Sequence, residues 1–331
     1  MQTDREIRLA EGRRTRTTLA VMFTVFVVAA LLLEVLLPMG LDTREALIGM
    51  DGGIGALTLT DGTAHLVLEA PPKGEGYAAW GLSPGRDRFV DVWYKTTGEK
   101  VEKASIQIRS ASSSRLRMEY AFEPGPEFLD TVQVGYVPGE AALWLLDSGR
   151  LSFLEYKTGE LTEVTLKGSK ELLRMESVCF SPDEQRLAYV RMVDSRPVLM
   201  IGSISGTVIS SVYQVDPGGF PNATGPFTWV NRSTILVVCG DDPSGGVTLQ
   251  KVVPQGPGNE TWTRILGPLT PDVIDFEVMS ISAAPSTKGW ALMVRSGDIV
   301  SVGIDWNDRP DPKPVILDFG PPRAPLRWAF F

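Results

Sequence analysis

The chain has 331 residues, of which 43% are hydrophobic and 22% charged, enough to bury a large core and incompatible with a disordered protein. Its 33 glycines and 24 prolines favour a turn-rich β architecture over a helical bundle. A net charge of −8 argues against a nucleic-acid partner, and the single histidine, His65, excludes most His-dependent catalytic triads and multi-histidine metal sites.

The first predicted element is an apolar segment near the N-terminus. Residues 19–37 are apolar apart from Thr24 and Glu34, and a helix of that length spans about 28 Å, close to the ~30 Å hydrocarbon core of a bilayer. A cleavable signal peptide is the alternative, but the run exceeds a typical signal core and no A-x-A site follows it. We therefore expect a transmembrane helix over 17–39, with the lipid bilayer as its partner.

Flanking charges predict the orientation of this helix. The tail, residues 1–16, contains five arginines, and no basic cluster follows the helix. The positive-inside rule places the tail in the cytoplasm and the rest of the chain in the periplasm or outside the cell. Glu34 could make an intramembrane contact with a partner helix or join a proton path, although a boundary carboxylate that reaches the headgroups is the favoured interpretation. Residues 40–53 are predicted to form a linker.

The remaining residues, 54–331, contain a recurring pattern: an apolar residue, a small residue, a turn marked by proline, and then a strongly apolar strand. The turn positions are separated by 54, 44, 49 and 54 residues, and they are Pro84, Pro138, Pro182, Asn231 and Pro285. This period fits one four-stranded β-propeller blade per unit. The sequence therefore predicts an all-β propeller.

The two ends of this region predict how the ring closes. Residues 54–69 give only two strands, 54–60 and 65–68, and residues 326–331 form an isolated apolar strand. Combined into one blade, they bring the total to six. Five or seven blades remain possible, because the repeat over 85–125 is irregular.

One copy of the repeat carries a family resemblance. The run from Ser181 to Tyr189, Ser-Pro-Asp-Glu-Gln-Arg-Leu-Ala-Tyr, resembles the repeat of TolB-type six-bladed β-propellers. Glu184 stands where that family usually has glycine. The resemblance covers 54–331 at the level of repeat shape and implies the fold, but it implies little about function because propellers serve many roles.

No group of residues predicts a catalytic, cofactor-binding or metal site. The acidic stretch 305–311 offers oxygen ligands for calcium, but Arg309 interrupts the ligand spacing, so a solvated loop is favoured. His65 is expected to be a surface or structural residue. Cys179 and Cys239 are expected to be free thiols, with a disulfide as the alternative.

Three of the four asparagines lie in N-x-[ST] sequons and are possible glycan acceptors: Asn222, Asn231 and Asn259. The proline-rich stretches 123–126 and 308–314 are stiff candidates for an exposed contact surface. We expect a non-enzymatic interaction or scaffold module that binds a protein partner at the outer face of the membrane. The alternatives are a hydrolase acting on glycans or peptides and a sensor that binds a small ligand at the propeller mouth.

Overall fold

A computed structural model describes most of the chain from Glu45 onward. The described residues are 45–50, 52–58, 63–139, 142–169, 173–215, 226–240, 247–269, 276–284, 289–296, 299–306, 315–318 and 328–329. They all belong to the second of two units, Gly40–Phe331, into which the chain divides. The predicted tail and transmembrane helix, with Glu34, lie outside the described residues. Within the described part, none of the helices has the length and apolarity needed to cross a bilayer.

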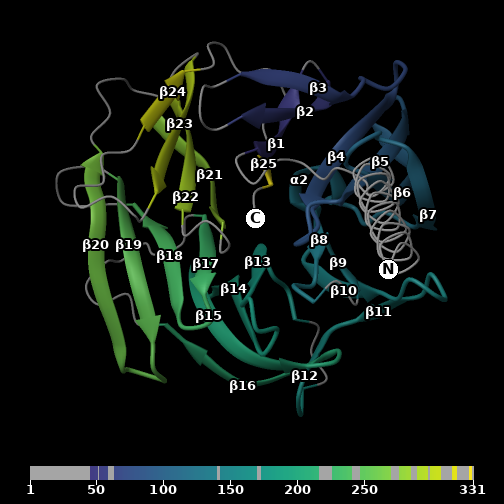
Figure 1. The fold of residues 1–331 in the computed structure, drawn as a ribbon. Helices are drawn as coiled ribbons and strands as arrows, with labels where there is room; N and C mark the ends of the chain where they lie inside the picture. Colours follow the sequence, from purple (N-terminus) through teal and green to yellow (C-terminus); the bar gives the residue numbers. More distant parts are fainter. Residues whose placement is uncertain are drawn as a thin grey trace, which may run out of the picture. The chain divides into compact units, whose positions relative to one another are not determined.

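The described strands form six sheets, numbered here in chain order (Figure 1). Sheet 1 contains β25 (Trp328–Ala329), β1 (Glu45–Met50), β2 (Gly53–Thr58) and β3 (Ala64–Leu68). Sheet 2 contains β4 (Glu75–Leu82), β5 (Arg88–Thr97), β6 (Lys100–Ser110) and β7 (Leu116–Phe122). The short helix α2 (Phe128–Thr131) leads into sheet 3, which contains β8 (Gln133–Tyr136), β9 (Leu143–Asp147), β10 (Arg150–Leu154) and β11 (Leu161–Glu163).

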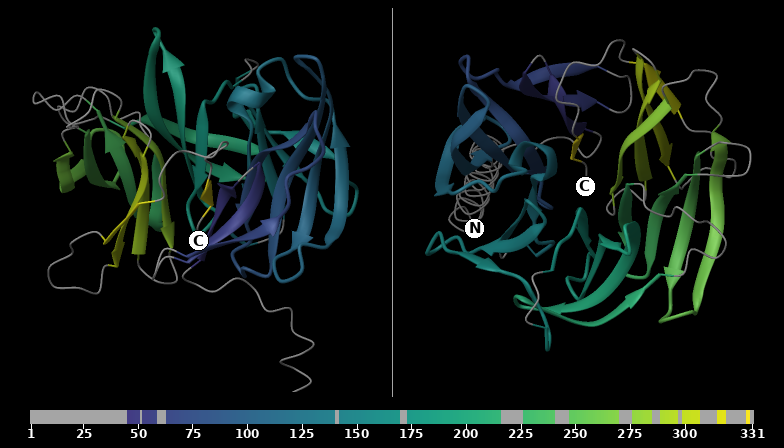
Figure 2. Two further views of the ribbon diagram at one scale, coloured as in Figure 1. Left: turned by 90° about the horizontal axis from the view of Figure 1, so that it is seen from above. Right: turned by 180° about the vertical axis from the view of Figure 1, so that it is seen from behind.

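The later sheets follow the same plan (Figure 2). Sheet 4 contains β13 (Ser177–Phe180), β14 (Arg186–Val193), β15 (Arg196–Ser205), β16 (Val208–Gln214) and, at its edge, β12 (Thr165–Leu166), which pairs parallel to β16. Sheet 5 contains β17 (Phe227–Asn231), β18 (Thr234–Cys239), β19 (Val247–Pro254) and β20 (Glu260–Leu269). Sheet 6 contains β21 (Phe276–Ala284), β22 (Gly289–Ser296), β23 (Ile299–Trp306) and β24 (Val315–Asp318).

Apolar side chains pack between consecutive sheets, as a β-propeller requires. In β14, Leu187 and Tyr189 belong to a core cluster shared with sheet 3, whereas Ala188 and Val190 belong to a cluster shared with sheet 5. Both faces of such a strand are buried, which explains why the strand is apolar at nearly every position. The chain is therefore an all-β propeller, and each sheet is stabilised mainly by its neighbours.

Sheet 1 combines strands from both ends of the propeller region. Leu47 of β1 pairs with Ala329 of β25, and Ile48 pairs with Trp328. The sequence correctly predicted that the two ends combine, but the linker assigned to 40–53 is wrong for residues 45–50, which form β1. Of the three glycines that suggested a linker, Gly40, Gly52 and Gly53, the last two lie where β1 leads into β2, and Gly52 has a φ of +81°.

Four of the predicted turn positions, Pro84, Pro138, Pro182 and Asn231, lie where the first strand of a sheet leads into the second, and Pro285 lies outside the described residues. Pro84 follows β4 and Pro182 follows β13. In the second of these turns, the Arg186 backbone N–H donates to Ser181 Oγ at 3.0 Å, and Ser181 Oγ donates to Asp183 Oδ1 at 2.6 Å. Glu184 has a φ of +59°, which explains why the TolB-type repeat usually has glycine at this position.

Candidate functional site

A cleft opens between the loop that follows β7 and strands β9, β10 and β11 of sheet 3. Its volume is about 380 Å³. The loop contributes residues 123–127, which include the first of the two proline-rich stretches. The lining residues are Phe122, Glu123, Gly125, Pro126, Glu127, Leu145, Asp147, Ser148, Arg150, Ser152, Leu161, Glu163 and Arg174. The cleft thus has an apolar portion and charged groups of both signs.

Hydrogen bonds fix the loop against the turn between β9 and β10. The Gly125 backbone N–H donates to Asp147 Oδ2 at 2.7 Å, and the Glu127 backbone N–H donates to Ser148 Oγ at 3.2 Å. Ser148 Oγ in turn donates to Asp147 Oδ1 at 3.0 Å. A Cβ on Gly125 would lie 2.2 Å from Ser148 Oγ, so glycine permits this close approach. The cleft is therefore preformed.

The helix α2 anchors the far end of the same loop. Phe128 is buried, with its ring 5.9 Å from that of Phe122 and 6.2 Å from that of Tyr94, the latter in an edge-to-face arrangement. Thr131 Oγ1 donates to the Glu127 carbonyl at 2.8 Å and accepts from the Ser148 backbone N–H at 2.9 Å. Packing and hydrogen bonds together hold the loop at both ends.

Most of the charged side chains in the cleft are available to a ligand. Asp147 is engaged by the loop, but five others form no ion pair with any residue that the structure describes. These are Glu123, Glu127, Arg150, Glu163 and Arg174. Arg150 and Arg174 are both exposed. Arg150 follows Gly149 in the sequence, and Arg174 lies near Gly149 because the Met175 backbone N–H donates to the Gly149 carbonyl at 2.9 Å. Both arginines therefore line the cleft from neighbouring backbone segments.

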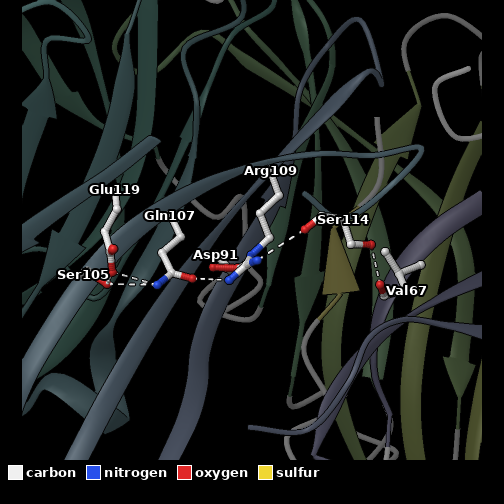
Figure 3. A network of polar contacts seen from close by, with 7 residues as sticks. All are labelled: Val67, Asp91, Ser105, Gln107, Arg109, Ser114 and Glu119. Carbon is white, nitrogen blue, oxygen red and sulfur yellow. Dashed lines mark hydrogen bonds and ion pairs between the residues drawn. The ribbon is translucent and has the colours of Figure 1, made fainter. Parts of the chain in front are cut away.

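Figure 3 shows a second polar group, within sheet 2, and none of its residues lines the cleft. Arg109 Nε donates to Asp91 Oδ1 at 2.8 Å, and Asp91 is fully buried. Gln107 Nε2 donates to Glu119 Oε1 at 2.8 Å, which extends the network to β7. Burial raises the pKa of Asp91 to about 6, and the Arg109 charge opposes that rise only in part.

The structure places the predicted residues apart from one another. Asn231 and Asn259 are exposed at hairpin turns of sheet 5, while Asn222 lies outside the described residues. His65 is exposed on β3. None of these described residues lines the cleft. Of the two proline-rich stretches, 123–126 lines it and 308–314 lies outside the described residues.

Both cysteines are free thiols in the structure. Cys239 is buried, and burial raises the pKa of its thiol to about 12. Cys179 is half-buried, and desolvation also raises its pKa. Burial therefore favours the protonated thiol at both positions.

Sequence reasoning missed most of the cleft. Asp147 lies on the same face of β9 as Leu143 and Leu145, and such a charged residue within an apolar blade strand is a usable signal. The same signal is present at Asp91, which interrupts the apolar run from Phe89 to Trp93. Arg174 carries no comparable signal, because it reaches the cleft from the segment before β13.

Comparisons with known proteins support the fold. No family model matches the sequence, and no curated protein sequence is similar to it. Among solved structures, a chain of the nidogen/laminin complex aligns with a TM-score of 0.57 at 12% identity, over 86% of this chain and 96% of that one. A protein assigned as TolB from Agrobacterium tumefaciens aligns with a TM-score of 0.55 at 14% identity, over 84% and 90% of the two chains. Kuenenia stuttgartiensis hydrazine synthase aligns with a TM-score of 0.54 at 11% identity, over 80% and 74%. At these identities the likeness is one of fold, and the chain is similar to TolB-like propellers in architecture.

Proposed function

We propose that this protein is a non-enzymatic interaction module that binds a segment of a partner protein in the cleft between the 123–127 loop and sheet 3. The observation that carries the proposal is the preformed cleft with five charged side chains that have no partner in the described part of the chain. Rigid sites lose little conformational entropy on binding. The loop is already held by Asp147 and Ser148, so it needs little further ordering.

The chemistry of the cleft favours a polypeptide of mixed charge. Phe122, Leu145 and Leu161 offer an apolar surface for one or two side chains, and Arg150 and Arg174 can bind a carboxylate in bidentate fashion. Glu123, Glu127 and Glu163 can bind a lysine or arginine of the same segment. A volume of about 380 Å³ suits a few side chains, so the rest of the partner would contact the surrounding rim.

The proposed location is the outer face of the cell membrane. The apolar residues 17–39 support a single-pass anchor, and the arginines of 1–16 support a cytoplasmic N-terminus. The propeller would then be periplasmic or extracellular. One structural neighbour is part of a nidogen/laminin complex, which is an example of a similar fold in a protein assembly.

We further propose that the six sheets form a closed six-bladed ring. The pairing of β1 with β25 supports closure, because it joins the two ends of the propeller region within one sheet. Contacts between β1 and β4, between β4 and β8, between β13 and β17 and between β17 and β21 support a circular order of the sheets.

Site-specific photo-crosslinking in native membranes tests the binding proposal. A photoreactive amino acid replaces Pro126 at the rim of the cleft, and a second full-length variant carries it at Val208, which is exposed on sheet 4. A single protein crosslinked through position 126 and not through 208 is the expected result. Arg150→Glu should abolish that crosslink, whereas Arg196→Glu, an equivalent charge reversal at an exposed turn, should leave it intact.

Two results would contradict the proposal. Crosslinking that is equal at positions 126 and 208, or insensitive to Arg150→Glu, would show that the cleft does not select a partner. Turnover of a glycan or peptide by the purified full-length protein, lost in Glu163→Gln, would show an enzyme instead.

A further inference from the structure

The contact between sheet 1 and sheet 2 contains two buried polar atoms that lack a hydrogen-bond partner in the described part of the chain. They are Nε1 of Trp80, a donor, and Oδ2 of Asp91, an acceptor. Trp80 is 5% exposed and Asp91 is 0% exposed, so bulk water does not reach either side chain freely. An unsatisfied buried polar group costs about 1–3 kcal/mol. Two such atoms on side chains of adjacent strands therefore call for an explanation.

The two residues are direct neighbours across a pair of strands. Trp80 of β4 pairs with Asp91 of β5 in the antiparallel register. Side chains of such a pair lie on the same face of the sheet, with their Cβ atoms about 4.5–5.5 Å apart. Trp80 shares its core cluster with Leu47 and Ile54 of sheet 1, so this face of sheet 2 is the one covered by sheet 1.

The contacts of Arg109 do not include Asp91 Oδ2. Arg109 donates from Nε to Asp91 Oδ1 at 2.8 Å and from a terminal nitrogen to the Ser114 carbonyl at 3.3 Å. Its other terminal nitrogen donates to Gln107 Oε1 (Figure 3). These contacts use three of the five guanidinium N–H groups, and none of the five donates to Asp91 Oδ2, so in this structure that oxygen has no donor from Arg109.

We propose that one water molecule is bound between sheets 1 and 2, where it accepts a hydrogen bond from Trp80 Nε1 and donates one to Asp91 Oδ2. Water can act as donor and acceptor at once, and buried waters typically make about three hydrogen bonds to groups that lack other partners. A cation is disfavoured because the site already holds the Arg109 guanidinium and an N–H donor. An anion is disfavoured by the Asp91 carboxylate.

This water connects the polar network of sheet 2 to the indole of Trp80, which lies in the apolar cluster shared by sheets 1 and 2. The indole, the carboxylate and the guanidinium then form one connected chain, with Gln107 and Glu119 continuing it to β7. The water site is independent of the proposed binding function, because Asp91 does not line the cleft.

Nuclear magnetic resonance of the full-length protein, with ¹⁵N-labelled tryptophan, tests the site. We expect the Trp80 indole proton to show a cross-peak to a long-lived water in a rotating-frame experiment. Trp229 is the matched control, since it is 2% exposed and its Nε1 donates directly to the Cys179 carbonyl at 3.2 Å. Its indole proton should show no such cross-peak. Trp80→Phe and Trp229→Phe assign the two signals, and Tyr77→Phe, which should retain the Trp80 cross-peak, excludes relay through a neighbouring hydroxyl.

A crystal structure of the full-length protein provides a second readout that needs no variant. Density for a water within hydrogen-bond distance of both Trp80 Nε1 and Asp91 Oδ2 is the expected result. An indole that donates directly to the carboxylate, or a Trp80 signal as free of water contact as that of Trp229, would overturn the proposal.

Discussion

Arg109 and Asp91 form an ion pair inside sheet 2, with 2.8 Å between Nε and Oδ1, and Asp91 is fully buried. The carboxyl group has a folded-state pKa of about 6, above the ~3.9 of an unfolded chain. A raised pKa means that the folded state binds this proton more tightly than the unfolded state does. The stability from protonated Asp91 is therefore fully present below about pH 4 and is lost as the pH rises through about 6.

The first prediction is that Asp91→Asn flattens the pH dependence of stability. Between pH 4 and 7, the free energy of unfolding of the natural protein should fall relative to that of the variant, by an amount on the order of 2 kcal/mol. Denaturant titrations at a series of pH values measure this difference. Asp130→Asn, at an exposed site on α2, should follow the natural protein. Parallel curves for the natural protein and Asp91→Asn would show that Asp91 does not titrate in this range.

The second prediction concerns the cost of breaking the same pair. Arg109→Met leaves a buried carboxylate without its counter-charge, which typically costs about 3–5 kcal/mol at neutral pH. Lys95→Met is the control, because Lys95 and Glu75 form an exposed pair at 3.3 Å that should contribute less than about 1 kcal/mol. Thermal and denaturant unfolding compare the two variants. Equal losses of unfolding free energy in the two variants would mean that the buried Arg109–Asp91 pair contributes no more to stability than the exposed Lys95–Glu75 pair.

The third prediction is that Glu184→Gly stabilises the protein. Glu184 has a φ of +59°, a conformation that costs an L-residue about 1–2 kcal/mol. Part of the gain is offset by the larger entropy of glycine in the unfolded chain, so we expect a net increase of about 0.5–1 kcal/mol in the free energy of unfolding. Gly149→Ala, at a φ of +81°, should have the opposite sign. A destabilised Glu184→Gly would show that the glutamate side chain contributes more than the strain costs.

The fourth prediction links the loop to binding. Gly125→Ala places a Cβ 2.2 Å from Ser148 Oγ and 2.7 Å from its Cβ, so the loop must move away from β9. Crosslinking of the partner through position 126 should then fall at least about tenfold, the equivalent of ~1.4 kcal/mol. Adding Ser148→Gly removes both clashing atoms and should restore part of the signal. Full crosslinking in Gly125→Ala alone would show that the loop conformation does not matter for binding.

The fifth prediction addresses the anchor. The full-length protein should remain in the membrane fraction after washing with alkaline carbonate, because an apolar helix over 17–39 would hold it there. Replacing Val27 and Leu31 with arginine should release it, since each arginine near the centre of a spanning helix costs roughly 2.5–3.5 kcal/mol. Replacing Gln2 and Thr3, in the tail, is the control. Release of the natural protein by carbonate would contradict the anchor.

The sequence predicted the propeller well because the repeat is a local signal. Pro84 and Pro182 mark turns whose hydrogen bonds form within a few residues, and the apolar strands that follow reflect burial on both faces. The strand β1 was missed because its six residues lie between glycines. Its identity as a strand depends on pairing with β2 and with β25, and a partner at Trp328 cannot be read from a local pattern.

The cleft was only partly predictable for a similar reason. The stiffness of 123–126 is a property of two prolines and can be recognised in the sequence. Arg150 and Arg174 line the same cleft because the segment before β13 runs beside Gly149. The backbone hydrogen bond from Met175 N–H to the Gly149 carbonyl fixes this path, and neither residue belongs to a recognisable motif. Charged residues on separate strands give no sign of a shared cleft until the sheets are placed.

The pairing of Leu47 with Ala329 has a consequence during synthesis. These two residues are 282 positions apart, so β1 is made long before its partner strand. Until then β1 has a free edge, and free edges are prone to pair with other chains. The growing polypeptide would need a chaperone or rapid folding of its later blades to avoid that, and a release from the ribosome before position 328 would leave a permanently open edge.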